Sequence, residues 1–351
     1  MRPPVDPARG TLLVAPPGAG FGRWAGAPGA YADGDVVYLV YRLRWPRPVR
    51  GAELVVARGD GTAFVPIWRA TRDDFASPSI ERCAIVREND RWRLYVSYVD
   101  GRSGRWRIDL LEADAPDRFD PATRTATFTA ENADAVAVKD PWLRRVAGRW
   151  LMFVSYGTVP DDLRGIHAGE DALSTGLTRS ETGLAESADG LRWTWRGRVL
   201  AAGKGWDRFT ARLTTAVSDS EGGWLGLYDG SASLEENYEE RCGLARSPDL
   251  RRWERLGDGP GVGAAGGPTA ATSCGPRGPR GPREPASGRR CKEGRTRTQE
   301  VSSCGASSSR SPWPRSPPSP SRRPRRPVPP VSTRRSPFRR PTAGPGRTES
   351  P

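Results

Sequence analysis

The sequence predicts an all-β protein of the β-propeller class with four recognisable blades. Three observations lead to this prediction. A hairpin rich in aromatic residues recurs four times, a turn motif recurs at a fixed offset, and no segment reads as a convincing amphipathic helix. A hairpin, a third strand and an outer strand in each repeat are typical of a four-stranded propeller blade.

The hairpins share a strand of β-branched and aromatic residues that follows a tight polar turn. Aligned on Val37, Trp92, Trp150 and Trp224, the four copies are spaced by 55, 58 and 74 residues, and the second and third share Trp-x-x-x-Val-Ser-Tyr. Turn residues before such strands indicate β-hairpins. After a short N-terminal segment, residues 1–19, we predict a propeller over residues 20–260. Its blades are expected at about 20–75, 76–130, 131–200 and 201–260.

A second motif completes the blade. Gly183-Leu-Ala-Glu-Ser187 leads to Trp193, and Gly243-Leu-Ala-Arg-Ser247 leads to Trp253, an offset of 60 residues throughout. Residues 56–61 and 111–114 are weaker copies. We interpret the motif as a third strand that ends in a Ser-x-Asp turn before an outer strand. Turns also recur in β-sandwiches, but a sandwich does not predict a preserved 60-residue offset.

Composition excludes several classes of protein. The 351 residues include one histidine, His167, whereas Ser-His-Asp catalysis and most metal sites need imidazole groups. Five cysteines do not make a disulfide scaffold, and no apolar run approaches the twenty or so residues of a membrane span. We expect no redox cofactor, no metal site and no membrane partner. The N-terminus shows no signal-peptide pattern, so a cytoplasmic location is expected.

A resemblance rests on three features: Lys139-Asp140-Pro141 before a hairpin, Gly148-Arg-Trp-Leu-Met-Phe-Val-Ser-Tyr156 after it, and the repeated Ser-x-Asp-x-x-x-Trp element. In this order, over about residues 20–258, the chain resembles the five-bladed propellers of glycoside hydrolase families 43, 32, 62 and 130. These include arabinanases, xylosidases, invertases and mannoside phosphorylases. The resemblance implies five blades, of which four are recognisable here, and a carbohydrate substrate. It implies cleavage of a glycosidic bond by carboxylates in a central funnel.

The start of each innermost strand should face that funnel. Counting back from the aligned hairpins gives Gly26-Ala27, Glu81, Asp140 and Arg212 for the four blades. Glu81 and Asp140 are the catalytic candidates, because glycoside cleavage needs one protonated and one ionised carboxyl group. By resemblance, Asp140 matches the aspartate that stabilises the transition state or tunes the acid, and Glu81 is the candidate for the acid.

The chain departs from the family pattern at two places. Blade one reads Trp24-Ala-Gly-Ala-Pro-Gly29 where the families carry an aspartate, and blade four reads Thr210-Ala-Arg-Leu213 where family 43 carries its acid. We therefore weigh a glycoside hydrolase or phosphorylase against a non-catalytic carbohydrate-binding propeller that has lost its blade-one aspartate.

Four further residues are candidates for substrate binding. Arg212 either binds a carboxylate or phosphate of the substrate, since its fork suits planar anions, or neutralises Asp140 and Glu81. Asp229 is a spare carboxylate at the end of a blade-four strand. Trp24 and Trp142 present apolar ring faces on which sugars stack. His167 lies in the long blade-three loop and is interpreted as a loop residue.

The C-terminal region differs from the body. Residues 271–351 hold 19 Lys and Arg against 4 Asp and Glu, whereas the first 270 residues hold 36 against 37. With 17 of the 34 prolines, the region should be disordered. No fifth hairpin follows Tyr228, so we expect a missing or scrambled fifth blade, and we interpret residues 261–351 as a tail produced by a frameshift. The competing reading is a genuine basic tail that binds nucleic acid or another polyanion non-specifically.

Overall fold

The computed structural model describes residues 10–160, 171–236 and 240–261, and all of them belong to one compact unit of the chain. They form sixteen β-strands and four short 3-10 helices, with no α-helix among them. The prediction of an all-β protein is therefore confirmed. In the part of the chain that the structure describes, no helix is long and apolar enough to cross a membrane.

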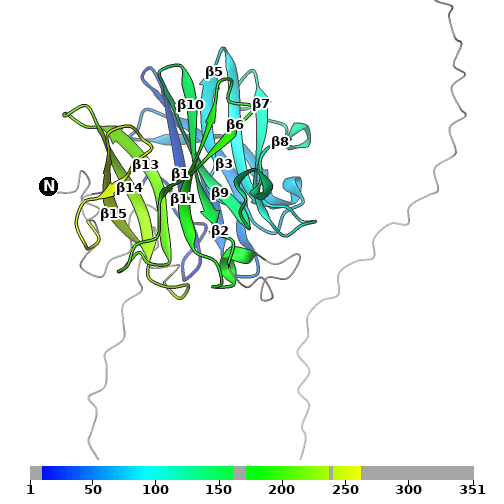
Figure 1. Cartoon of the computed structure of the whole chain (residues 1–351). Coiled ribbons are helices and arrows are strands. Elements are labelled where there is room, and N and C mark those ends of the chain that lie inside the picture. Colours follow the sequence, from blue (N-terminus) through cyan, green and yellow to red (C-terminus); the bar gives the residue numbers. More distant parts are fainter. Residues whose placement is uncertain (1–9, 161–170, 237–239, 262–351) are drawn as a thin grey trace, which may run out of the picture. The chain divides into compact units, whose positions relative to one another are not determined.

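The strands form four antiparallel groups of four (Figure 1). The first two groups are β1 (Trp24–Asp33), β2 (Val36–Trp45), β3 (Arg50–Gly59) and β4 (Phe64–Thr71), then β5 (Ala84–Glu88), β6 (Arg91–Val99), β7 (Trp106–Ala113) and β8 (Thr125–Phe128). The last two are β9 (Ala137–Val146), β10 (Arg149–Gly157), β11 (Ser180–Ser187) and β12 (Thr194–Leu200), then β13 (Thr210–Ser218), β14 (Trp224–Ser231), β15 (Arg241–Ser247) and β16 (Glu254–Arg255). The 3-10 helices are η2 (Arg72–Phe75), η3 (Pro121–Thr123), η4 (Ala130–Ala133) and η5 (Ala172–Ser174).

Each group is a meander, in which every strand pairs with the next one along the chain. The recurring aromatic strands predicted from the sequence are the second strands β2, β6, β10 and β14. The third and fourth groups also join through one parallel bridge between Ser180 and Thr210. We refer to the four groups as blades one to four, because successive four-stranded meanders that pack face to face are the arrangement of a propeller.

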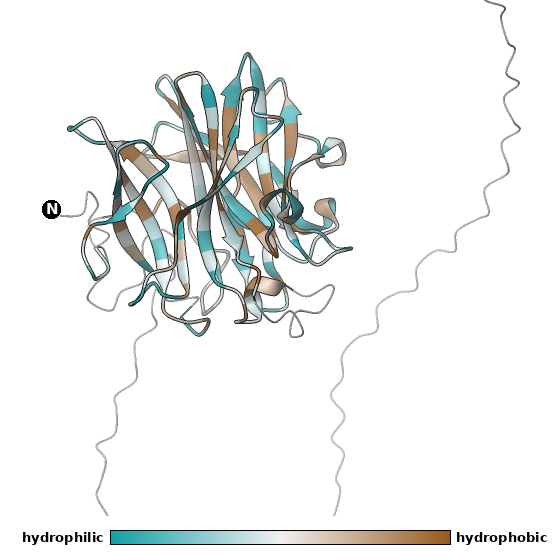
Figure 2. Ribbon diagram, viewed as in Figure 1, coloured by the Kyte–Doolittle hydropathy of each residue, from teal (hydrophilic) through white to brown (hydrophobic). Residues whose placement is uncertain are grey.

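Packing between blades explains why the second strands are hydrophobic on both faces. In β6, Leu94 and Val96 pack against blade one, whereas Tyr95 between them packs against blade three. In β10, Met152 packs toward blade two and Phe153 toward blade four. Alternate side chains of a strand point to opposite faces, so a blade between two others needs apolar residues at every position. Figure 2 shows these hydrophobic segments along the central strands.

The Ser-x-Asp motif is a turn that links the third and outer strands. The Ser187 hydroxyl accepts hydrogen bonds from the Asp189 and Gly190 amides, and Asp189 Oδ1 accepts from two further amides at 2.8 and 3.0 Å. Ser247 and Asp249 repeat this arrangement in blade four. The amides on its carboxylate lower the pKa of Asp189 to about 2. The repeat therefore has a structural cause, because its side chains bond the turn backbone.

The predicted fifth blade and the C-terminal tail fall after residue 261, outside the described residues. Their interpretation as a frameshift product or as a polyanion-binding tail stays a prediction.

Candidate active site

An extra residue in the innermost strand of each blade shapes the centre of the molecule. The register shifts by one residue between Gly26 and Gly29 in β1, opposite Phe153–Ser155 in β9, and between Leu213 and Thr215 in β13. Blade two has the same irregularity. It lies between the bridge that joins Ile80 to Tyr98 and the start of β5. Such β-bulges redirect side chains and are common beside active sites.

The strand register corrects, by one residue, the set of funnel-facing residues predicted by counting back from the hairpins. Lys139 pairs with Ser155, Arg212 pairs with Asp229, and the Glu81 amide donates to the Ser97 carbonyl. Glu81 is therefore equivalent to Lys139 and Arg212, whereas Asp140 lies one residue further along, equivalent to Ala27 in blade one and Arg82 in blade two. Ala27 and Asp140 share a positive φ, 52° and 57°, and each precedes a proline.

The bulges and their partner strands surround a cavity of about 80 Å³. Its lining includes seven basic and five acidic side chains, a formal excess of two positive charges. The basic residues are Arg42, Arg44, Arg47, Arg50, Arg82, Lys139 and Arg212, and the acidic residues are Glu81, Asp140, Asp171, Asp229 and Glu240. Arg47 is exposed, so the cavity reaches solvent beside it.

Ion pairs connect the blades across this cavity. Arg42 Nη2 of blade one lies 2.7 Å from Glu81 Oε2 of blade two, and Arg82 Nη2 of blade two lies 3.7 Å from Asp229 Oδ2 of blade four. Arg212 forms an ion pair with Glu240. Breaking a close buried pair by removing one partner typically costs about 3–5 kcal/mol, so the contact of 2.7 Å between Arg42 and Glu81 also stabilises the packing of blade one on blade two.

Asp140 is held as an anion. Its Oδ1 accepts a hydrogen bond from the Arg82 amide at 3.2 Å, and its own amide donates to Ser97 Oγ at 3.2 Å. Lys139 Nζ lies 3.5 Å from Oδ2. Burial alone would raise the pKa of Asp140, but the positive charges of Lys139, Arg82, Arg212 and Arg42 outweigh it and hold the pKa below the ordinary value of 3.8.

Asp229 has the opposite environment. Its side chain is 2% exposed, and its carboxylate contacts Arg82 only at 3.7 Å. Among the described residues, no donor forms a hydrogen bond with its Oδ1 atom. Burial, assisted by the negative charge of Asp140, therefore outweighs the pull of Arg82 and Arg212 and raises the pKa of Asp229 above 3.8. One cavity thus holds two buried aspartates whose pKa values move apart.

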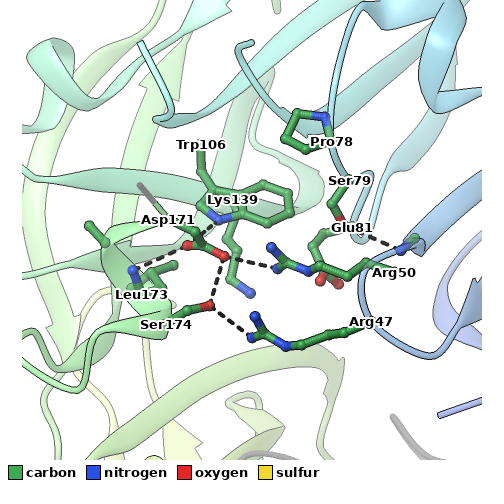
Figure 3. Close-up of polar contacts among 12 residues, drawn as sticks. Arg47, Arg50, Pro78, Ser79, Glu81, Trp106, Lys139, Asp171, Leu173 and Ser174 are labelled. Atoms are coloured by element: carbon green, nitrogen blue, oxygen red, sulfur yellow. Dashed lines mark hydrogen bonds and ion pairs between the residues drawn. The ribbon is translucent and has the colours of Figure 1, made fainter. Parts of the chain in front are cut away.

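Asp171 organises the wall of the cavity (Figure 3). It accepts hydrogen bonds from Trp106 Nε1 at 2.8 Å and Ser174 Oγ at 2.9 Å, and its Oδ2 lies 2.9 Å from Arg50 Nη2. Arg47 Nη2 donates to the same Ser174 hydroxyl at 3.5 Å. Burial opposes ionisation, yet Arg50, Lys139 and these donors keep the pKa of Asp171 below its usual value. Asp171 therefore fixes Arg50 at the edge of the cavity.

Five of the six residues predicted from the sequence line this one cavity: Asp140, Glu81, Arg212, Asp229 and Trp24. One face of the Trp24 ring is covered by the Arg44 guanidinium, 4.3 Å from its centroid, so the predicted stacking of a sugar is limited to the other face. Trp142 does not line the cavity. Its ring packs against Phe153 with centroids 5.0 Å apart, between blades three and four. His167 lies outside the described residues.

Three residues that line the cavity, Arg42, Arg82 and Asp171, are not among the site residues predicted from the sequence. A signal for Arg42 was present, because it lies five residues after Val37, as Ser97, Ser155 and Asp229 lie five residues after their aligned tryptophans. These four residues lie on the second strand of each blade. They pair with the corrected set of inner-strand residues, which is Gly26, Glu81, Lys139 and Arg212. Asp171 lies in a connecting segment before η5, where no repeat marks it.

No known protein family and no curated protein matches the chain by sequence. Solved structures do match. A thermostable family-43 glycoside hydrolase has a TM-score of 0.49 at 15% identity, over 70% of this chain and 76% of that chain. β-1,2-Mannobiose phosphorylase from Listeria innocua, in complex with β-1,2-mannobiose, has a TM-score of 0.46 at 15% identity, over 66% and 75%.

A GH43_1 enzyme from Xanthomonas citri, complexed with xylose, has a TM-score of 0.45 at 12% identity, over 66% of this chain and 73% of that chain. These proteins are what the chain is similar to. At such identities and TM-scores, residue roles in this chain rest on its own geometry.

Proposed function

We propose that the chain cleaves a glycosidic bond at this cavity, with Asp229 as the general acid and Asp140 as the ionised carboxylate. The observation that carries the proposal is the pair of buried aspartates with pKa values displaced in opposite directions. Glycoside cleavage uses one carboxyl group to protonate the leaving oxygen and one carboxylate to act as base or nucleophile.

The surrounding residues support this division of roles. Asp229 is buried, and no described residue donates a hydrogen bond to its Oδ1, which favours its neutral, proton-donating form. Asp140 is surrounded by cations, which keep it available as an anion at neutral pH. Glu81 is engaged with Arg42 at 2.7 Å, so we assign it to positioning Arg42 rather than to proton donation.

The test compares leaving groups. Aryl glycosides with a poor leaving group need protonation, whereas 2,4-dinitrophenyl glycosides leave without it. For Asp229→Asn, we expect turnover of the poor leaving group to fall by about 10²–10⁴-fold, with turnover of the dinitrophenyl glycoside largely retained. Asp114→Asn, an exposed aspartate on the molecular surface, is the matched control. Equal losses on both substrates would assign Asp229 a role other than acid.

A specific observation also favours a second function, a carbohydrate-binding propeller without turnover. Ala27 occupies the blade-one position equivalent to Asp140, where the methyl group supplies no charge. The cavity of about 80 Å³ is also small beside the roughly 300–1,000 Å³ typical of ligand pockets. Sugar binding by wild type, with no turnover of either aryl glycoside, would select this function.

A further inference from the structure

The cavity contains buried cationic donors that the ion pairs do not satisfy. Arg42 Nε and Nη1 and Arg82 Nε are buried, and no described residue accepts a hydrogen bond from them. The two side chains are 9% and 6% exposed. A buried donor without an acceptor has lost its hydrogen bond to water and gained none in return, and the loss is greater for a charged group, so these donors are poised to bind an acceptor.

The arginines that carry these donors line the same cavity. The charges of Arg42, Arg82 and Arg212 all act on the Asp140 carboxylate, although they come from blades one, two and four. The lining keeps an excess of positive charge when every carboxylate is counted as ionised. An entering anion would therefore meet both unmet N–H groups and a favourable field.

The size of the cavity limits what enters. A cavity of about 80 Å³ leaves room for a small anionic group beside Arg42 and Arg82, and the exposed Arg47 marks where the cavity meets solvent. Resting on the function proposed above, we propose that the substrate is an anionic sugar, a uronate, whose carboxylate is bound by Arg42 and Arg82. Arginine forks match the planar geometry of a carboxylate.

The experiment measures binding directly, by isothermal titration of the full chain with glucuronate, galacturonate, glucose, galactose and inorganic phosphate. We expect a uronate to bind at least tenfold more tightly than its matched neutral sugar, with affinity that falls as salt is raised. Equal binding of uronate and neutral sugar would overturn the proposal. Binding of phosphate alone would also overturn it, since the anion would then not be carried by the sugar.

Variants identify the donors. Arg42→Lys keeps the charge beside Glu81 and so preserves folding, but it removes the planar fork, and we expect uronate affinity to fall about tenfold. Arg82→Lys should act in the same way. Arg69→Met, in which an exposed arginine of β4 is removed from the same blade as Arg42, is the control and should bind like wild type. Unchanged affinity in both lysine variants would place the anion elsewhere.

The outcomes separate this inference from the proposed function. Uronate binding without turnover of any glycoside would sustain the anion site and overturn the cleavage reaction. The opposite outcome is turnover of neutral glycosides at the same rate as glucuronides and galacturonides, with no uronate preference in binding. It would sustain the cleavage reaction and overturn the anion site.

Discussion

Blades one and three have the same bulge but different side chains at it. In both, a residue with positive φ precedes a proline and lies at a register shift opposite the second strand. Blade three presents Asp140 there, whereas blade one presents Ala27. The partner residue on the second strand also differs, because Ser155 faces Lys139 and Arg42 faces Gly26. The backbone is thus repeated, while the charge is not.

This difference indicates that each blade contributes its own charged residues to the centre, although the backbone of the repeat is the same. Blade one contributes cations, through Arg42, Arg44, Arg47 and Arg50, and no carboxylate to the cavity lining. Blades two, three and four contribute the carboxylates that balance most of them. An anion at the centre is therefore drawn toward blade one, and the aspartates available for proton transfer lie in blades three and four.

The largest expected effect comes from making blade three resemble blade one in charge. Asp140→Asn should lower turnover of both aryl glycosides by about 10³-fold, because the ionised carboxylate is lost. It should also lower the free energy of unfolding at pH 7 by about 3 kcal/mol, since Lys139 and Arg82 lose a buried counter-charge. Enzyme assay and urea unfolding measure the two effects, with Asp114→Asn as control. Full turnover in Asp140→Asn would remove that residue from the reaction.

A smaller effect of opposite sign is expected from Asp229→Asn. The folded-state pKa of Asp229 is raised, so the proton it binds stabilises the fold below 3.8, and that stabilisation is lost as pH rises through the folded pKa. At pH 7 the neutral amide avoids the cost that Asp229 imposes on folding, which is either a buried charge or a proton held well above the ordinary pKa of an aspartate. The free energy of unfolding of the variant should exceed that of wild type by on the order of 1 kcal/mol at pH 7. The difference should shrink as the pH falls toward 3.8. Destabilisation of Asp229→Asn at pH 7 would contradict this.

The smallest effect is expected when blade one is made to resemble blade three. Ala27→Asp suits a φ of 52°, because aspartate tolerates the left-handed region better than alanine. The new carboxylate enters a cavity with excess positive charge, so we expect stabilisation by about 0.5–1 kcal/mol in urea unfolding. Ala147→Asp is the control, because Ala147 has a φ of 48° in an exposed hairpin turn. It measures how much an aspartate stabilises this backbone conformation without the cavity. A gain no larger than the control's would argue against a positive cavity.

Much of the fold could be predicted because its causes are local. The Ser187 and Asp189 side chains bond the amides of their own turn, so the motif is visible in the sequence. The β10 strand is apolar at every position from residue 150 to residue 154 because both of its faces are buried between blades, and this too leaves a continuous pattern.

The site was predicted only in part. Asp140, Glu81 and Arg212 could be brought together by counting back from the hairpins, but the bulges add a residue to each inner strand and shift the equivalence by one. Asp171 contacts Trp106 across 65 positions of sequence, a contact that no repeat encodes. Trp142 follows the bulge directly, yet its ring points into the packing between blades, because the alternation along β9 resumes there.

The proposed division of roles depends on the opposite pKa displacements of Asp140 and Asp229, and these can be measured without any substrate. Carboxyl NMR titration of the chain with isotope-labelled aspartate, assigned with Asp140→Asn and Asp229→Asn, follows each group directly. We predict that Asp140 titrates below 3.8 and that Asp229 titrates above it. Titration of both aspartates below 3.8 would contradict it, because the cavity would then hold no proton donor.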